Sequence, residues 1–206
     1  HTTMKYSDIY RLYSTSQPKD AIHQALREVS VDDSDEQYED RSPLHLACQY
    51  GDTEGVKILL ERDAEPNTKD ANGSTPIHIL GRTSAGCADE DKLKEIAVVL
   101  MEHGANIPRS AKNTTALIEC VRNRHFKMAE AIINSGTRVN STDLNGENVL
   151  FGFCAASGDI RRDIRFAKKE LDESVQYSYP ENKIEEIRSR IARLEDDGEA
   201  AYRLAR

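Results

Sequence analysis

The chain has 206 residues, a formal net charge of −8, 38% hydrophobic residues and 31% charged residues. A chain this acidic repels phosphate backbones, so we expect no nucleic-acid partner, and a partner protein with a basic surface is favoured. It contains no run of about 18 apolar residues, so we also expect no insertion into a membrane. The high share of charged residues is typical of an array of thin modules, because much of each module is surface.

Residues 5–36 form the first expected unit. Apolar residues fall on one side of a helix over 18–29, and a second helix is expected over 6–13. Val31 precedes Pro43 by 12 residues, a separation that recurs in the next module. Residues 5–36 therefore fit a helical cap, or a degenerate first module, that covers the apolar end of an array.

The strongest signal is a short sequence that recurs 33 residues along the chain. Residues 42–47 read SPLHLA and residues 75–80 read TPIHIL. Proline is favoured at the first position of a helix, and the Ser or Thr before it can cap the helix. The motif and its period resemble those of ankyrin repeats. In that family the His of the motif is structural, so we expect His45 and His78 to bond the neighbouring turn rather than to act in catalysis or bind a metal.

The resemblance covers residues 37–157. It implies an all-α repeat solenoid of helix–turn–helix modules joined by β-turn loops, with extra helices at the C-terminal end. The second module exceeds the first by about eight residues, which we place between its two helices, around Ser84 to Asp91. The third module lacks the Pro and the His but keeps an apolar outer helix. The inner helix of a fourth module is expected over Val149 to Ser157.

Outer helices of the array are expected to end in a left-handed residue. Gly104 and Gly136 stand where such a helix end favours glycine. Asp63 replaces glycine at the matching position of the first module, a departure that costs about 1 kcal/mol or less.

Residues 158–206 depart from the repeat pattern. A charged helix is expected over 159–175, a turn over 177–180, and then a second charged helix with an apolar stripe that begins at Ile184. The Asp197-Gly198 pair then precedes a segment that resembles the start of an outer helix. Two interpretations stay open. The two helices are either a hairpin inserted into the fourth module, with the chain ending inside its outer helix, or a cap that ends the array.

The residues that could support catalysis or hold a cofactor form no known pattern. The sequence contains no nucleophile motif, phosphate-binding glycine loop or HExxH motif, so we expect no enzyme, no cofactor and no metal site. The acidic run over 32–40 lacks the glycine and the final glutamate of a calcium loop and is interpreted as a solvated linker. Cys48, Cys120 and Cys154 recur near the module period and are expected to be buried, whereas Cys87 is expected to be exposed.

The resemblance implies a non-catalytic protein–protein interaction module, in which turn tips and the concave face of the inner helices bind a partner protein. The positions that match these surfaces are Tyr38, Glu39, Arg41, Gln49, Tyr50, Ala71, Asn72, Ser74, Arg82, Thr83, Ala111, Lys112, Thr114, Arg122, Asn123, Leu144, Asn145 and Glu147. The alternatives are a regulatory or targeting domain of a larger enzyme, and a ligand-binding or enzymatic site in the inserted helices. We expect a cytoplasmic protein, with a secreted effector as the alternative.

Overall fold

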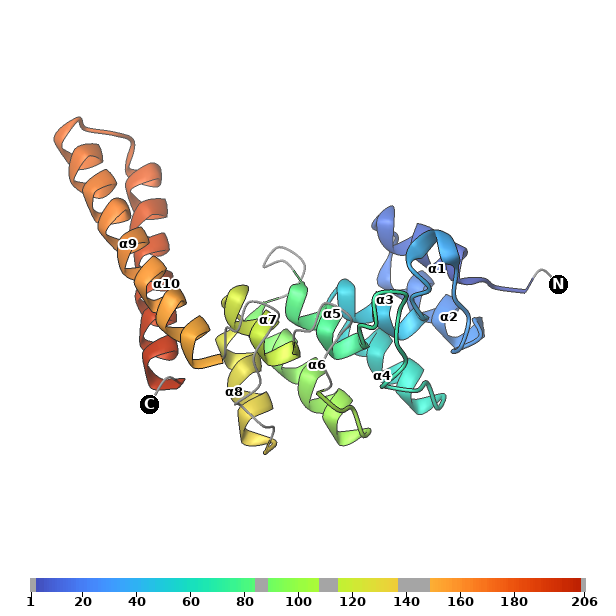
Figure 1. Cartoon of the computed structure of the whole chain (residues 1–206). Helices are drawn as coiled ribbons and strands as arrows, with labels where there is room; N and C mark the ends of the chain where they lie inside the picture. Colours follow the sequence, from blue (N-terminus) through green and yellow to red (C-terminus); the bar gives the residue numbers. More distant parts are fainter. Residues whose placement is uncertain (1–2, 84–88, 108–114, 137–148, 205–206) are drawn as a thin grey trace.

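A computed structural model describes residues 3–83, 89–107, 115–136 and 149–204, and it describes only the backbone of residues 149–154 and 157. The described residues form ten α-helices and one short 3₁₀-helix, and none of them lies in a β-strand. The helices stack as an elongated array with a two-helix arm at the C-terminal end (Figure 1).

The N-terminal end of the described array is a pair of helices with a short 3₁₀-helix, which we call the cap. It consists of α1 (Tyr6–Ser14), α2 (Lys19–Glu28) and the 3₁₀-helix η1 (Glu36–Tyr38). The predicted helix pair is confirmed, because α1 and α2 bury one side each and pack against the first full repeat. Ile9, Leu26 and Val29 are fully buried in this contact.

Three full helix pairs follow the cap. The inner helices are α3 (Pro43–Gln49), α5 (Pro76–Arg82) and α7 (Ala116–Arg122), and the outer helices are α4 (Thr53–Glu61), α6 (Glu90–Glu102) and α8 (Phe126–Asn134). Inner helices pack on inner helices and outer helices on outer helices, so the pairs form two parallel rows (Figure 1). This arrangement confirms the predicted all-α repeat solenoid.

Local sequence signals fix the ends of these helices. Pro43 and Pro76 occupy the first turn of α3 and α5, as expected. The residue after the C-cap of the outer helices is left-handed, with φ angles of 61° at Asp63, 89° at Gly104 and 84° at Gly136. The predicted left-handed positions are therefore confirmed, including the one at which aspartate replaces glycine.

The second repeat differs from expectation at the start of its outer helix. Asp89 caps α6 by accepting a hydrogen bond from the Lys92 amide, so Glu90 and Asp91 belong to the helix and not to an inserted loop. The helix has 13 residues, whereas α4 has 9. About half of the extra length therefore extends α6, because an acidic cap and first turn favour helix there. Residues 84–88 of the expected insertion lie outside the described part.

The C-terminal region contains two long unbroken helices, α9 (Val149–Gln176) and α10 (Glu181–Leu204). The expected helix end at Ser157 and the expected break at Asp197-Gly198 are both wrong. Gly198 lies inside α10, where a Cβ would come within 3.3 Å of Ile160, so glycine permits close helix packing instead of ending the helix. The predicted turn over 177–180 is confirmed.

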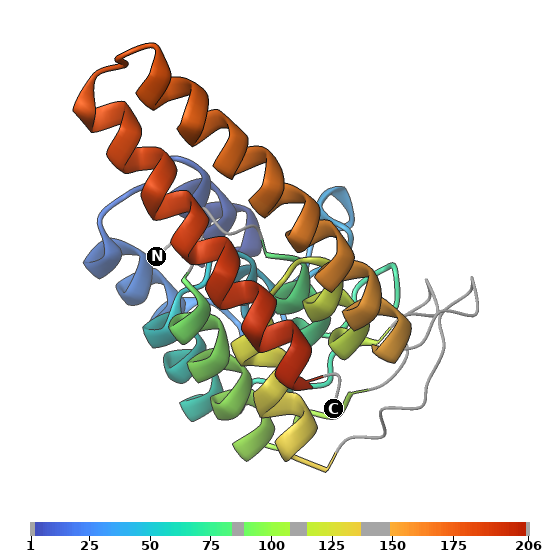
Figure 2. The same ribbon diagram turned by 90° about the vertical axis from the view of Figure 1, so that its left-hand side faces the viewer.

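The base of this helix pair occupies the place of a fourth repeat. The start of α9 packs on the inner helix α7, and the end of α10 packs on the outer helix α8. Beyond this base the two helices run side by side away from the array as a hairpin arm (Figures 1 and 2). One pair of helices therefore forms both a layer packed on α7 and α8 and the arm, and the two interpretations of this layer, an interrupted fourth module or a cap, stay predictions.

Two hydrophobic clusters hold the molecule together. The larger one runs through the whole array, from Tyr6 in the cap to Ala201 in α10. The smaller one lies in the arm and contains Ala167, Ile187 and Ile191, with Leu171 and Leu194 packed against it. The array is therefore continuous, whereas the arm depends on a single helix–helix seam.

Candidate functional site

The expected contact residues fall into four groups in the structure. Those exposed to solvent are Glu39, Ala71, Arg122 and Asn123. Those that are partly buried are Tyr38, Arg41, Gln49, Tyr50, Asn72 and Arg82. Ser74 and Thr83 are buried. The remaining six lie outside the described residues: Ala111, Lys112, Thr114, Leu144, Asn145 and Glu147.

Ser74 and Thr83 are corrections to the expected contact set. The Ser74 side chain accepts a hydrogen bond from Arg82 at 2.9 Å, and its carbonyl accepts one from His45 at 2.8 Å. The Thr83 hydroxyl bonds the Cys48 carbonyl at 3.3 Å, so it joins two repeats. Both side chains are turned into the contact between repeats, where they cannot reach a partner.

Arg41 forms the first step of a row of polar contacts along the inner helices. Its guanidinium lies 2.6 Å from Glu39 and 3.4 Å from Asp70, and it donates to Gln49 at 2.9 Å. The Asp70 side chain is fully buried, and the Arg41 side chain is 21% exposed. Because these contacts span two repeats, they hold the exposed edge of Arg41 in one position.

Arg82 forms the second step in the next repeat. It contacts Glu119 of α7 at 3.1 Å in addition to Ser74. Asn123 continues the row by donating to the Gly81 carbonyl at 3.1 Å. We call these residues together the polar ladder: Arg41, Gln49, Asp70, Ser74, Arg82, Glu119 and Asn123. The ladder joins α3, α5 and α7, and its contacts between repeats link residues 29 to 42 positions apart in sequence.

The two expected tyrosines belong to an aromatic cluster at the cap. Tyr38 packs against Tyr10 and Tyr6, with ring centroids 4.2 Å and 5.7 Å away. Tyr50 stacks on Tyr13 at 4.8 Å with an interplanar angle of 12°. Each ring is therefore fixed by a neighbour from another element, and only part of it faces solvent.

The predicted bond from a motif histidine to the neighbouring turn is confirmed for His45, and the turn that follows His78 lies outside the described residues. His45 Nδ1 accepts from the Ser42 amide at 3.1 Å, and Nε2 donates to the Ser74 carbonyl of the next repeat at 2.8 Å. Burial lowers the pKa of His45, so it stays neutral at pH 7. His78 makes the same contact with Thr75, whose amide lies 3.2 Å from Nδ1.

A buried carboxylate that the sequence analysis did not single out joins the cap to the first repeat. Asp52 accepts from Tyr13 Oη at 2.8 Å and from the Gly55 amide at 3.2 Å, and His23 Nε2 lies 3.0 Å away. Burial by itself raises the pKa of Asp52, but the hydrogen bonds from His23 and Tyr13 and the charge of Lys19 outweigh it, so the pKa lies below its usual value. The available sequence signal was its place as N-cap of α4.

His125 takes the matching N-cap position of α8 and was also missed. Its Nε2 lies 2.6 Å from the Thr83 carbonyl, and its Nδ1 lies 3.0 Å from Glu90 of α6. Each of these two N-cap residues therefore contacts the layer that precedes its helix. Asp52, before α4, contacts the cap, and His125, before α8, contacts the second repeat. These contacts explain why both residues are buried.

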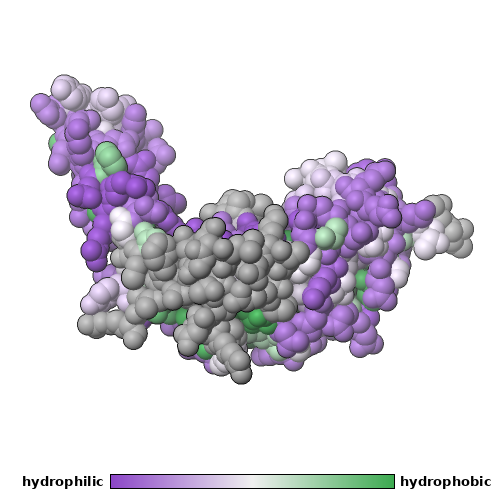
Figure 3. Space-filling view, in the orientation of Figure 1, coloured by the Kyte–Doolittle hydropathy of each residue, from purple (hydrophilic) through white to green (hydrophobic). Residues whose placement is uncertain are grey.

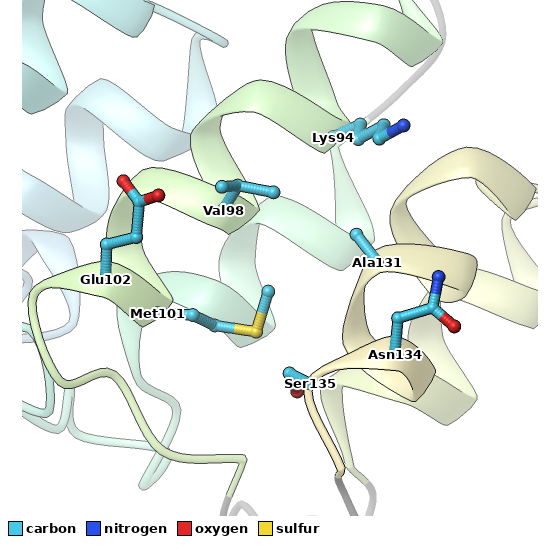
Figure 4. Close-up of a pocket in the computed structure, with 7 residues that line it drawn as sticks. All are labelled: Lys94, Val98, Met101, Glu102, Ala131, Asn134 and Ser135. Atoms are coloured by element: carbon cyan, nitrogen blue, oxygen red, sulfur yellow. The ribbon is translucent and has the colours of Figure 1, made fainter.

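The outer side of the array contains a shallow groove between neighbouring repeats. Figure 4 shows its walls, and the side chains that line it are Lys94, Val98, Met101 and Glu102 of α6 and Ala131, Asn134 and Ser135 of α8. Its volume is about 470 Å³. The floor is apolar, and its polar groups stand apart at the rim, so the groove holds no acid–base pair positioned for catalysis.

The part of the chain that the structure describes offers neither a metal site nor a membrane-spanning helix. No group of three or more His, Cys, Asp or Glu there could hold a metal ion, and none of its helices has the length and apolar character needed to cross a membrane. Cys48 and Cys120 are buried, as predicted, and burial raises the pKa of both thiols. Cys87 and the side chain of Cys154 lie outside the part that the structure describes, so the expected exposure of Cys87 and burial of Cys154 stay predictions.

Comparison with known proteins gives matches to one kind of repeat. Residues 26–80 match the family described as ankyrin repeats (many copies). The chain is 46% identical over 48 residues, 23% of its length, to the transient receptor potential cation channel subfamily A member 1 homolog of Caenorhabditis elegans, and 31% identical over 134 residues, 65% of its length, to neurogenic locus notch homolog protein 1 of Mus musculus. It spans only 4% and 5% of these two relatives. The repeated TPxH-type motif, the stacked helix pairs and the family match together show that residues 26–80 of this chain are ankyrin repeats.

Proposed function

We propose that this chain is a non-catalytic binding module that holds a partner protein against its polar ladder and turn tips. Ankyrin repeats are generally protein–protein interaction modules. The observation that carries the proposal for this chain is the ladder itself, because Arg41 before α3, Arg82 at the end of α5 and Asn123 after α7 are each joined to a neighbouring repeat by a polar contact.

The contacts within the ladder prepare these side chains for binding. A free arginine loses about 0.5–1.5 kcal/mol of conformational freedom when a partner immobilises it. Arg41 and Arg82 have already lost much of that freedom, because buried or half-buried acids hold them. Arginines and tyrosines fixed in this way are the residue types that most often dominate binding energy.

The surroundings of the ladder also favour binding on this side. The N-terminal cap and the hairpin arm rise on the side of the array that carries the inner helices (Figures 1 and 3). A partner seated there would contact the ladder and the exposed turn residues Glu39 and Ala71. Within the ladder the arginines are paired with acids, so this surface fits a polar partner that carries both charges.

The preference for a basic partner stays a prediction. It rests on the net charge of −8 and on the acidic run over 32–40, which includes Glu39. We expect the basic part of a partner to lie over this run, at the cap end of the ladder.

Blocking variants test the proposed surface. Ala71→Arg places a large side chain at a turn tip, and Arg122→Glu reverses an exposed charge at the end of α7. Lys94→Glu is the matched control, because it makes the same charge change on the outer helix α6. Affinity capture with quantitative mass spectrometry should recover the same partner with the wild type and the control, and at least about tenfold less with the two blocking variants. Equal recovery with all four proteins would contradict this surface.

A further inference from the structure

The hairpin arm carries a basic surface that the ladder does not use. Arg162, Arg165, Phe166 and Lys169 line a shallow hollow of about 450 Å³ on α9. Their spacing of three, four and seven residues places them on one side of the helix. We call these four residues the α9 outer face.

This face points away from the packed seam of the arm. Ile160 and Ala167 of α9 are buried, whereas Phe166 is 66% exposed. Burying Phe166 would not require any change in the seam, because Ala167 and Leu171 already fill it. The visible surface of the arm is mostly hydrophilic with few apolar spots (Figure 3). The other residues that line the hollow are all basic, so Phe166 is an apolar group among charged neighbours.

The charge around Phe166 opposes the charge of the chain. Residues 161–169 contain five basic residues and one acidic residue, in a chain of net charge −8. Lys168 pairs with Glu195 of α10, Arg162 pairs with Asp159 and Asp163, and Lys169 lies 3.8 Å from Glu173. Within the described residues, Arg161 and Arg165 form no ion pair. Their charges are available to another molecule.

We propose that the α9 outer face is a second docking surface, which receives an acidic amphipathic segment of a partner protein. Such a segment would bury an apolar side chain against Phe166 and place its carboxylates over Arg162, Arg165 and Lys169. Arginine forms two-pronged hydrogen bonds with carboxylates, which gives the contact direction as well as attraction. Polyanions such as nucleic acids are a poorer match, because the chain as a whole repels them.

The size of the face sets the expected strength. One helix side with a single aromatic anchor lies at the small end of specific interfaces, so we expect weak, salt-dependent binding. Because this surface is on the arm and the ladder is on the array, the two surfaces can be tested independently.

An unbiased peptide display provides the test. A library of random 16-residue peptides is selected on the full chain, and the enriched peptides are synthesised with a fluorescent label for anisotropy titration. We expect acidic peptides with aliphatic or aromatic residues at helical spacing. Arg165→Glu and Phe166→Ser should each weaken their binding by about tenfold or more. Arg193→Glu, the same charge change on the exposed side of α10, should leave it unchanged.

Three results would overturn the proposal. One is a selection that yields no acidic peptides. Another is acidic peptides whose affinity is the same for the wild type and for Arg165→Glu and Phe166→Ser. The third is a loss, in the Phe166→Ser variant alone, of self-association detected by sedimentation, which would assign the face to a second copy of the chain. Circular dichroism checks that the variants fold, and they should, because the exposed Phe166 packs against no core residue.

Discussion

The array and the arm are built from the same kind of helix but are held together differently. Each helix pair of the array contacts a layer on either side, and polar contacts such as His45 to Ser74 and Arg82 to Glu119 cross each junction. The arm beyond its base has one seam, formed by α9 and α10. The array therefore fixes its exposed side chains through neighbouring repeats, whereas the arm leaves one side of each helix without contacts.

This difference bears on function. In a repeat array, stability comes from each repeat and from its contacts with the next one, so a change at a junction is felt by neighbouring layers. A helix pair that projects from the array can open locally without unfolding the rest. The ladder is thus a rigid surface, and the α9 outer face is carried on a region of lower local stability.

The largest expected effect comes from shortening one buried side chain in the array and one in the arm. The two variants should destabilise different regions. Leu59→Ala removes a fully buried side chain between layers of the array and should lower the free energy of unfolding by about 2–5 kcal/mol. Ile187→Ala in the arm should instead speed amide exchange over 161–195 and leave 43–134 protected. Hydrogen exchange with mass spectrometry measures both. Faster exchange throughout the array in Ile187→Ala would show that the arm is not an independent unit.

The junction between cap and array should be nearly as sensitive. Asp52→Ala leaves the Tyr13 hydroxyl and the Gly55 amide without their acceptor, so we expect a loss of about 2–4 kcal/mol in urea unfolding. Folding lowers the pKa of Asp52. Its carboxylate therefore contributes fully to the free energy of unfolding above the unfolded-state pKa of about 4, and this contribution is lost as the pH falls through the folded-state pKa. Asp91→Asn is the control, because its partner Lys127 is exposed. An equal loss in both variants would mean that burial of Asp52 is unimportant.

Alkaline pH should weaken the cap next. Burial raises the pKa of Tyr6 and Tyr13, and the Asp52 carboxylate raises that of Tyr13 further. The stabilisation by these tyrosines is complete below their unfolded-state pKa of about 10. At pH 11 each one lowers the free energy of unfolding by about 1.4 kcal/mol. Phenolate absorbance should show two tyrosines that ionise only when the cap opens. Titration of all tyrosines together, before any loss of helix, would contradict this account.

The smallest expected effect comes from a substitution at the left-handed residue that follows an outer helix. Asp63→Gly places glycine at the left-handed position that Gly104 and Gly136 occupy in the following repeats. We expect stabilisation by about 0.5–1 kcal/mol, because glycine adopts a φ of 61° without strain. A raised midpoint of thermal unfolding would show it. Gly104→Asp, the reverse change in the next repeat, should lower the midpoint by a similar amount.

Much of the fold could be predicted because its signals are local. Pro43, Pro76 and the left-handed glycines specify helix starts and ends through neighbouring backbone alone. The candidate surface was predicted less well. Ser74 and Thr83 were placed on it by register, but register gives the side of a helix and not the depth at which the next repeat buries it. Asp52 and His125 were missed because their partners lie in other layers.

The sequence by itself determined the repeat period, the two rows of helices and the left-handed ends of α4, α6 and α8, since these signals lie in the residues of each repeat. Only the tertiary structure decided how Arg41 and Arg82 are paired, because their partners come from adjoining repeats. It also decided that α9 and α10 continue unbroken past Ser157 and Gly198, where packing against α7 and α8 favours helix over the breaks that the local sequence indicates. Local signals set the repeats, and contacts between layers set the surface that the repeats present.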